Sequence, residues 1–116
     1  MKTLQNHLIG VDQGDVPLFS DFEDGGEMWT GQGPREKRRT IPFSSPFRQP
    51  PAVHLSISML DADTAAAVRL ELKPEAVTRE GFDIVCRTWL DTRIARMRVT
   101  WLAIGSLPHE DDWDLI

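Results

Sequence analysis

Apolar and polar residues alternate along four segments of this chain, and this two-residue period constrains the fold more than any other feature. Every second residue is apolar in residues 53–59, 68–73 and 95–103, and the segment 82–89 continues the pattern with Phe82, Ile84 and Cys86, followed by Thr88. No segment keeps a sustained 3.6-residue period. Short strands separated by turn signals about every 8–12 residues predict an all-β chain folded as an antiparallel β-sandwich.

The chain divides into three parts, although 116 residues and 13.1 kDa leave room for one domain only. Residues 1–34 hold six of the eight glycines, and we expect them to form an irregular N-terminal arm. Met28 and Trp29 lie within this arm and would anchor it to the domain or to a neighbouring subunit. The β pattern begins at residue 35, so residues 35–105 should form the sandwich and residues 106–116 an acidic C-terminal tail.

The net charge of −5 is unevenly distributed. Residues 1–30 carry six acidic residues against one lysine, residues 110–116 carry four acids, and the part between them has twelve basic residues against eight acidic ones. The acidic ends would repel phosphate, and the basic residues are not interleaved with aromatic ones, so we expect no nucleic-acid partner. Acidic ends favour solubility, and the tail is alternatively a docking segment for a basic face of a protein partner.

The sequence gives little support for catalysis or for a metal site. It lacks the short motifs of α/β-hydrolases, P-loop proteins and zinc metalloproteases. The single cysteine, Cys86, and three scattered histidines do not suffice for a zinc site. Asp61 and Asp63 would allow a calcium site, but an Asp-rich turn is the favoured interpretation. We therefore expect a non-enzymatic chain without a cofactor or a metal ion.

Two further patterns bear on where the chain works. No apolar run approaches the roughly 18 residues that a membrane-spanning helix needs. The first residues also lack the apolar core of a secretory signal. We therefore expect that the chain does not insert into a membrane. We also expect that it is synthesised in the cytoplasm and displayed outside the cell as part of a larger assembly.

The strand expected at residues 95–103 has arginines between its apolar positions. Arg96 and Arg98 flank Met97, and the alternation continues to Trp101. This pattern suits a strand whose second face meets another subunit better than one that faces free water. We therefore expect Arg96, Met97, Arg98 and Trp101 at an oligomer interface.

A binding surface is suggested by Arg69, Arg87 and Trp89, because guanidinium donors beside a flat indole suit a sugar ring. The alternative is structural. The two arginines would then pair with acids such as Glu71 or Asp83, and Trp89 would belong to the core.

The segment from Ile41 to Ile104 resembles the H-type lectin domain, a family that includes the snail agglutinins and the discoidins. The matching pieces include Phe43-Ser44-Ser45-Pro46-Phe47, Leu55–Asp61, Gly81-Phe82, Thr88-Trp89, Asp91-Thr92-Arg93 and Val99–Gly105. The resemblance implies a six-stranded antiparallel β-sandwich that forms a homotrimer, doubled to a hexamer in some members. It also implies shallow sites for N-acetylgalactosamine or galactose between adjacent subunits.

The resemblance carries the sugar site over only in part. Arg69 and Trp89 match the family's arginine and tryptophan, whereas Leu90 and Ala95 stand in place of a histidine and a tyrosine. Gln32 falls near the acidic residue that grips sugar hydroxyls, and an amide is a weaker acceptor than a carboxylate. The resemblance therefore implies a preference other than that of galactose-type binders. The candidate glycan-binding residues are Gln32, Arg69, Trp89, Leu90 and Asp91.

Two functions follow from these observations. The first is a lectin for a bacterial or cell-surface polysaccharide, and Arg69, Arg87 and Arg93 would favour an acidic one. The alternative is a structural or receptor-binding trimeric module of a larger assembly, such as the spike or fibre of a phage-like particle. That module would bind no sugar and would dock through its acidic tail.

Overall fold

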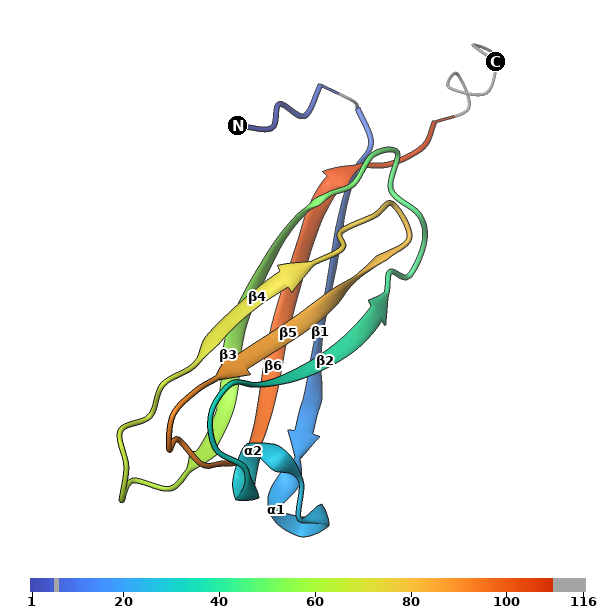
Figure 1. The fold of residues 1–116 in the computed structure, drawn as a ribbon. Coiled ribbons are helices and arrows are strands. Elements are labelled where there is room, and N and C mark those ends of the chain that lie inside the picture. The colour runs from blue at the N-terminus through green and yellow to red at the C-terminus, as the bar shows by residue number, and fades with distance from the viewer. Residues whose placement is uncertain (6, 110–116) are drawn as a thin grey trace.

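The computed structural model describes residues 1–5 and 7–109 (Figure 1). Its secondary structure is almost entirely β, with two helices of a single turn. In chain order the elements are β1 (Ile9–Ser20), α1 (Asp21–Asp24), α2 (Glu27–Thr30), β2 (Arg35–Pro42), β3 (Ala52–Ala62), β4 (Glu71–Glu75), β5 (Gly81–Thr88) and β6 (Ile94–Ser106). The acidic residues 110–116, for which a docking role is expected, lie outside the described residues.

The six described strands form two sheets, which confirms the predicted all-β sandwich. One sheet has the order β1-β6-β3 and the other β2-β5-β4, and the pairs are antiparallel. The two sheets lie face to face along the long axis of the molecule (Figure 1). The segments that follow α2, precede β4 and follow β5 all reach the end of the sandwich where the two helices lie (Figure 1).

The core lies between the two sheets and takes its side chains from the alternating positions. β5 contributes Phe82, Ile84 and Cys86, and β6 contributes Met97 and Val99, all essentially inaccessible to solvent. An aromatic cluster joins the sheets at one level of the core. Its members are Phe43, Phe47, Phe82 and Trp101. A buried side chain of this size contributes about 1.5–3 kcal/mol of hydrophobic stabilisation, so the cluster helps to hold the two sheets together.

The prediction of an irregular arm is wrong for residues 9–20. These residues form β1, which pairs with β6 from Ile9 opposite Ser106 to Ser20 opposite Arg96. The sequence hides this strand because glycines occupy inward positions. A Cβ atom at Gly10 would meet Leu107, and one at Gly14 would meet the indole of Trp101. Side chains from elsewhere fill the space that apolar residues of β1 would otherwise occupy.

The region around residue 69 also differs from the prediction. A strand was expected at residues 68–73, but β4 begins at Glu71 and runs to Glu75. Threonine side chains hold the chain before it. The Thr92 hydroxyl accepts the backbone N–H of Arg69, and the Thr88 hydroxyl donates to the Arg69 carbonyl. At Arg69, hydrogen bonds to threonine side chains therefore take the place of backbone hydrogen bonds to a neighbouring strand.

Met97 and Trp101 are core residues, so their assignment to an oligomer interface is wrong for the side chains. Met97 is fully buried within the single chain, and Trp101 packs against Phe82. The alternation of β6 turns these residues inward and Arg96 and Arg98 outward. Of the four residues expected at the interface, the two arginines alone face away from the sandwich.

Candidate functional site

A shallow depression at the helix end of the sandwich gathers four of the five predicted glycan-binding residues. It has a volume of about 470 Å³ and is lined by Gln32, Gly33, Arg69, Leu90 and Asp91. These residues come from three segments: the loop after α2, the chain before β4 and the loop after β5. The fold thus brings together residues that lie up to 59 positions apart in the sequence, from Gln32 to Asp91.

An arginine–carboxylate pair forms one side of the depression. Nη1 of Arg69 donates to Oδ1 of Asp91 at 2.8 Å and to the carbonyl oxygen of Ala67 at 3.3 Å. The Arg69 side chain is 30% exposed and that of Asp91 is 63% exposed. The pair therefore offers a donor and an acceptor, fixed relative to each other, to a ligand that arrives from solvent.

Arg35 holds the two loops that face each other across the depression. Its side chain is buried and donates to the carbonyl oxygens of Gly33, Glu27, Met28 and Leu90. Leu90 also accepts the backbone N–H of Gly33 at 2.9 Å. The carbonyl of Leu90 thus receives two donors, which fixes the loop after β5 against the loop before β2. The sequence did not predict this role, because nothing in it distinguishes a buried arginine at the start of a strand from an exposed one.

Backbone conformation adds to the fixed shape of these loops. Gly33 has φ of 75° and Leu90 has φ of 57°, both in the left-handed region. Glycine adopts this region without strain, whereas leucine does so at a cost of roughly 1 kcal/mol or more. The strained residue is 59% exposed and lines the depression. Its conformation is maintained by the two hydrogen bonds to its carbonyl group.

Trp89, the fifth predicted residue, lies in an adjoining depression. That depression has a volume of about 320 Å³ and is lined by Pro34, Arg35, Glu36, Arg87, Thr88 and Trp89. The indole is 40% exposed, so Trp89 is not the core residue that the structural alternative required. The structure therefore places Trp89 beside, rather than inside, the depression that holds Arg69.

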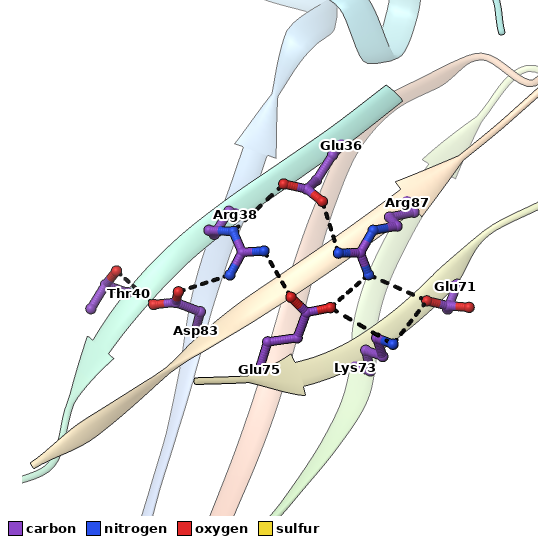
Figure 2. A network of polar contacts seen from close by, with 8 residues as sticks. All are labelled: Glu36, Arg38, Thr40, Glu71, Lys73, Glu75, Asp83 and Arg87. Carbon is purple, nitrogen blue, oxygen red and sulfur yellow. Dashed lines mark hydrogen bonds and ion pairs between the residues drawn. The ribbon is translucent and has the colours of Figure 1, made fainter. Parts of the chain in front are cut away.

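Arg87 belongs to a network of ion pairs on the outer face of the β2-β5-β4 sheet (Figure 2). It contacts Glu36 at 2.9 Å, Glu75 at 2.7 Å and Glu71 at 3.4 Å. Arg38 contacts Glu75 at 2.8 Å and Asp83 at 2.9 Å. The structural alternative thus holds for Arg87, which pairs with Glu71 as expected, whereas Asp83 pairs with Arg38.

This network shifts the proton equilibria of its members. Hydrogen bonds from Arg87 and Arg38 lower the pKa of Glu75 to about 2, from an ordinary value of 4.5. The Thr40 hydroxyl and Arg38 lower the pKa of Asp83. The same contacts raise the pKa of Arg38 and that of Arg87. These groups therefore stay charged across the ordinary pH range and neutralise one another on the surface.

The remaining predicted residues have structural partners. Arg96 contacts Asp61 at 3.1 Å, and Arg98 contacts Asp15 at 3.3 Å. Asp63 contacts Arg93 at 3.3 Å and accepts the backbone N–H of Ala65, so both aspartates of the expected turn face arginines.

Two absences concern the described residues alone. Among them, no three histidine, cysteine, aspartate or glutamate side chains gather where a metal ion would bind. No helix in that part of the chain has the length and apolar character needed to cross a membrane. Cys86 is buried in the core, and burial raises the pKa of its thiol to about 11. A thiol in that state is a packing residue rather than a nucleophile or metal ligand.

Comparison with known proteins gives consistent matches. Residues 38–104 match the model of the H-type lectin domain family. A protein of Fuscovulum blasticum named "ATP synthase subunits region ORF 7" is 51% identical over 107 residues, which are 92% of this chain and 93% of that protein. A discoidin-1 polypeptide of Dictyostelium discoideum is 31% identical over 81 residues, which are 69% of this chain and 32% of that polypeptide.

Solved structures of discoidin II from Dictyostelium discoideum share the fold. The recombinant protein superposes with a TM-score of 0.75 at 24% identity, over 90% of this chain and 40% of discoidin II. The wild-type protein gives a TM-score of 0.76 at 25% identity, over 91% of this chain and 39% of the other. The chain thus spans only about a third of the discoidin-1 polypeptide and about two fifths of discoidin II.

Proposed function

Because the chain belongs to the H-type lectin domain family, we propose that it is a non-catalytic lectin that binds glycans at the helix end of the sandwich. The single observation that carries this proposal is the depression that brings Gln32, Arg69, Leu90 and Asp91 together. A fixed guanidinium and carboxylate suit sugar hydroxyls, which both donate and accept hydrogen bonds. The exposed indole of Trp89 beside them suits the apolar face of a sugar ring.

The ligand we propose is a neutral glycan of a bacterial or other cell surface. The three arginines that would attract an acidic polysaccharide each have an acidic partner within the chain: Arg69 contacts Asp91, Arg93 contacts Asp63, and Arg87 contacts three glutamates. Their positive charge is therefore matched before a ligand arrives. An acidic sugar would gain little from them and would lose its hydration.

Galactose and N-acetylgalactosamine should bind poorly. Leu90 presents an apolar, 59% exposed side chain where the snail agglutinins have an imidazole. Ala95 is buried and has no hydroxyl to offer, and Gln32 supplies an amide in place of a carboxylate. Sugar hydroxyls that leave water without a partner cost about 1–3 kcal/mol each, so these changes oppose the galactose-type arrangement.

We further propose that the lectin is a homotrimer with its glycan sites between subunits. The support lies on the outer face of the β1-β6-β3 sheet, where Ile9 is 42% exposed and Val11 is 63% exposed, opposite the outward positions Ser106 and Ile104 of β6. Exposed apolar side chains on a strand face are typical of a surface that another subunit covers. Arg96 and Arg98 lie on the same sheet and would form the polar part of the interface.

A glycan array tests the proposed function. The wild-type protein should bind a set of neutral glycans, and Arg69→Ala should lose this binding because the guanidinium–carboxylate pair is broken. Arg39→Ala is the matched control, since Arg39 is an exposed arginine outside both depressions that also donates to a backbone carbonyl. Array binding that survives Arg69→Ala would contradict the site. The absence of any binding by an intact trimer would instead favour the structural module.

A further inference from the structure

Two depressions share the same two chain segments. Gln32 and Gly33 line the first, and residues 34–36 line the second. On the opposite side, Leu90 and Asp91 line the first, and residues 87–89 line the second. The segments run antiparallel, with Arg35 opposite Thr88 and Glu36 opposite Arg87. The depressions are therefore consecutive positions along one groove, offset by two to three residues of extended chain, or roughly 7–10 Å.

The second depression has the chemical character of a sugar subsite. It combines the exposed indole of Trp89 with the ring of Pro34 and with polar groups at its rim. The polar groups are the carboxylate of Glu36 and the guanidinium of Arg87, which contact each other at 2.9 Å. Figure 2 shows this pair at the end of the ion-pair network nearest the loops. An aromatic platform beside a donor and an acceptor is an arrangement that holds a polyol ring.

Charge selects the kind of sugar. Arg87 already faces Glu36, Glu71 and Glu75, and Arg38 faces Glu36, Glu75 and Asp83. With Lys73, the network has three basic residues against four acidic ones, a formal charge of −1. An anionic sugar would meet carboxylates as well as the guanidinium, whereas a neutral one would meet hydrogen-bonding groups without a net repulsion.

We propose that this chain binds neutral oligosaccharides of at least two residues, with one sugar at Arg69 and Asp91 and the next at Trp89, Glu36 and Arg87. The proposal rests on the proposed lectin function and adds a second subsite to it. Leu90 lines the first depression and Trp89 the second, so the glycosidic linkage would pass between these two neighbouring residues. Affinity should therefore depend on the length of the glycan as well as on the identity of its terminal sugar.

Isothermal titration calorimetry with saccharides of increasing length tests the second subsite. The probes are neutral gluco-, galacto- and manno-oligosaccharides, each series running from the monosaccharide to the trisaccharide. In the best series the disaccharide should bind about tenfold more tightly than the monosaccharide, the gain expected from one added stacking platform. Arg87→Met should lower the ratio of disaccharide to monosaccharide affinity, because it removes the guanidinium donor of the second subsite and breaks its contact with Glu36.

Lys73→Met is the matched control for this experiment. Lys73 belongs to the same ion-pair network and contacts Glu71 and Glu75 at 3.7 Å, but it does not line the depression. It should keep the full length dependence, and circular dichroism should show both variants folded. Equal affinities for the monosaccharide and the disaccharide would overturn the second subsite and leave the lectin function standing. Failure of every saccharide to bind would overturn the lectin function and the subsite with it.

Discussion

At the scale of single residues, glycine decides how β1 joins the sandwich. A Cβ atom on Gly14 would lie 2.6 Å from Nε1 of Trp101, and one on Gly10 would lie 2.6 Å from Cδ2 of Leu107. The indole is a rigid ring in the aromatic core cluster, whereas Leu107 is a half-buried side chain that can rotate. A side chain at Gly14 should therefore destabilise the strand more than one at Gly10.

We predict that Gly14→Ala lowers the free energy of unfolding by about 1–3 kcal/mol, because the ring of Trp101 must move against Phe43 and Phe82. Gly10→Ala is the control and should cost clearly less, since Leu107 can give way. Urea denaturation followed by tryptophan fluorescence measures both values. A loss for Gly14→Ala no larger than that for Gly10→Ala would show that the indole is not held in place.

The residues of the site show what sequence reasoning reaches at this scale. Arg69, Leu90 and Asp91 were identifiable, because a family resemblance fixes positions along the chain. The sequence did not show that Trp89 lies in a different depression from these three residues, because that placement depends on how two loops pack against each other. The buried guanidinium of Arg35 controls that packing through its hydrogen bonds to four carbonyls. A network of this kind depends on backbone atoms, which leave no pattern in the order of side chains.

At the scale of elements, the clearest predictions came from strands with inward apolar side chains. The alternation of residues 82–88 and 95–103 predicted β5 and β6, since their apolar positions are those that the structure buries. β1 was missed because its inward positions include Gly10 and Gly14, whose space is filled by other segments. β4 was placed too early because the hydroxyls of Thr88 and Thr92 hold residues 67–69 outside the sheet.

The ion-pair network belongs to this scale, since it ties β2 and β4 to β5 (Figure 2). We predict that it makes the sandwich sensitive to acid. The pKa of Glu75 is about 2 in the folded chain and 4.5 ordinarily, so its charged form stabilises the fold above about pH 4.5. That contribution should disappear as the pH falls from about 4.5 towards 2, because the folded and unfolded states then bind the proton alike.

The measurement is the free energy of unfolding by urea at a series of pH values. Glu75→Gln should be less stable than wild type at pH 7, and the difference should shrink as the pH falls through this window. Glu23→Gln is the control, since Glu23 is an exposed residue of α1 outside the network. A difference between Glu75→Gln and wild type that stays constant from pH 7 to pH 2 would contradict the role given to the network.

At the scale of the whole molecule, we predict a homotrimer. Light scattering of the purified protein should give a mass of about 39 kDa, three times the 13.1 kDa of the chain. Arg96→Glu should shift the protein towards the monomer, because it sets a second carboxylate beside Asp61 on the outer face of β6. Lys73→Glu reverses a charge beside acids on the opposite sheet and should leave the mass unchanged. A wild-type mass near that of one chain at micromolar concentration would contradict the trimer.

The central claim is that a neutral glycan binds in the depression between the loop after α2 and the loop after β5. Its most direct test is an amide and indole chemical-shift map of the isotopically labelled protein, titrated with the neutral glycan that gives the strongest array signal. We predict shifts at Gln32, Gly33 and Arg69 and throughout residues 87–91, with the far end of the sandwich unaffected. Shifts centred instead on the small cavity beside Asp12 and Ser44, or no shift with any glycan tested, would contradict the account.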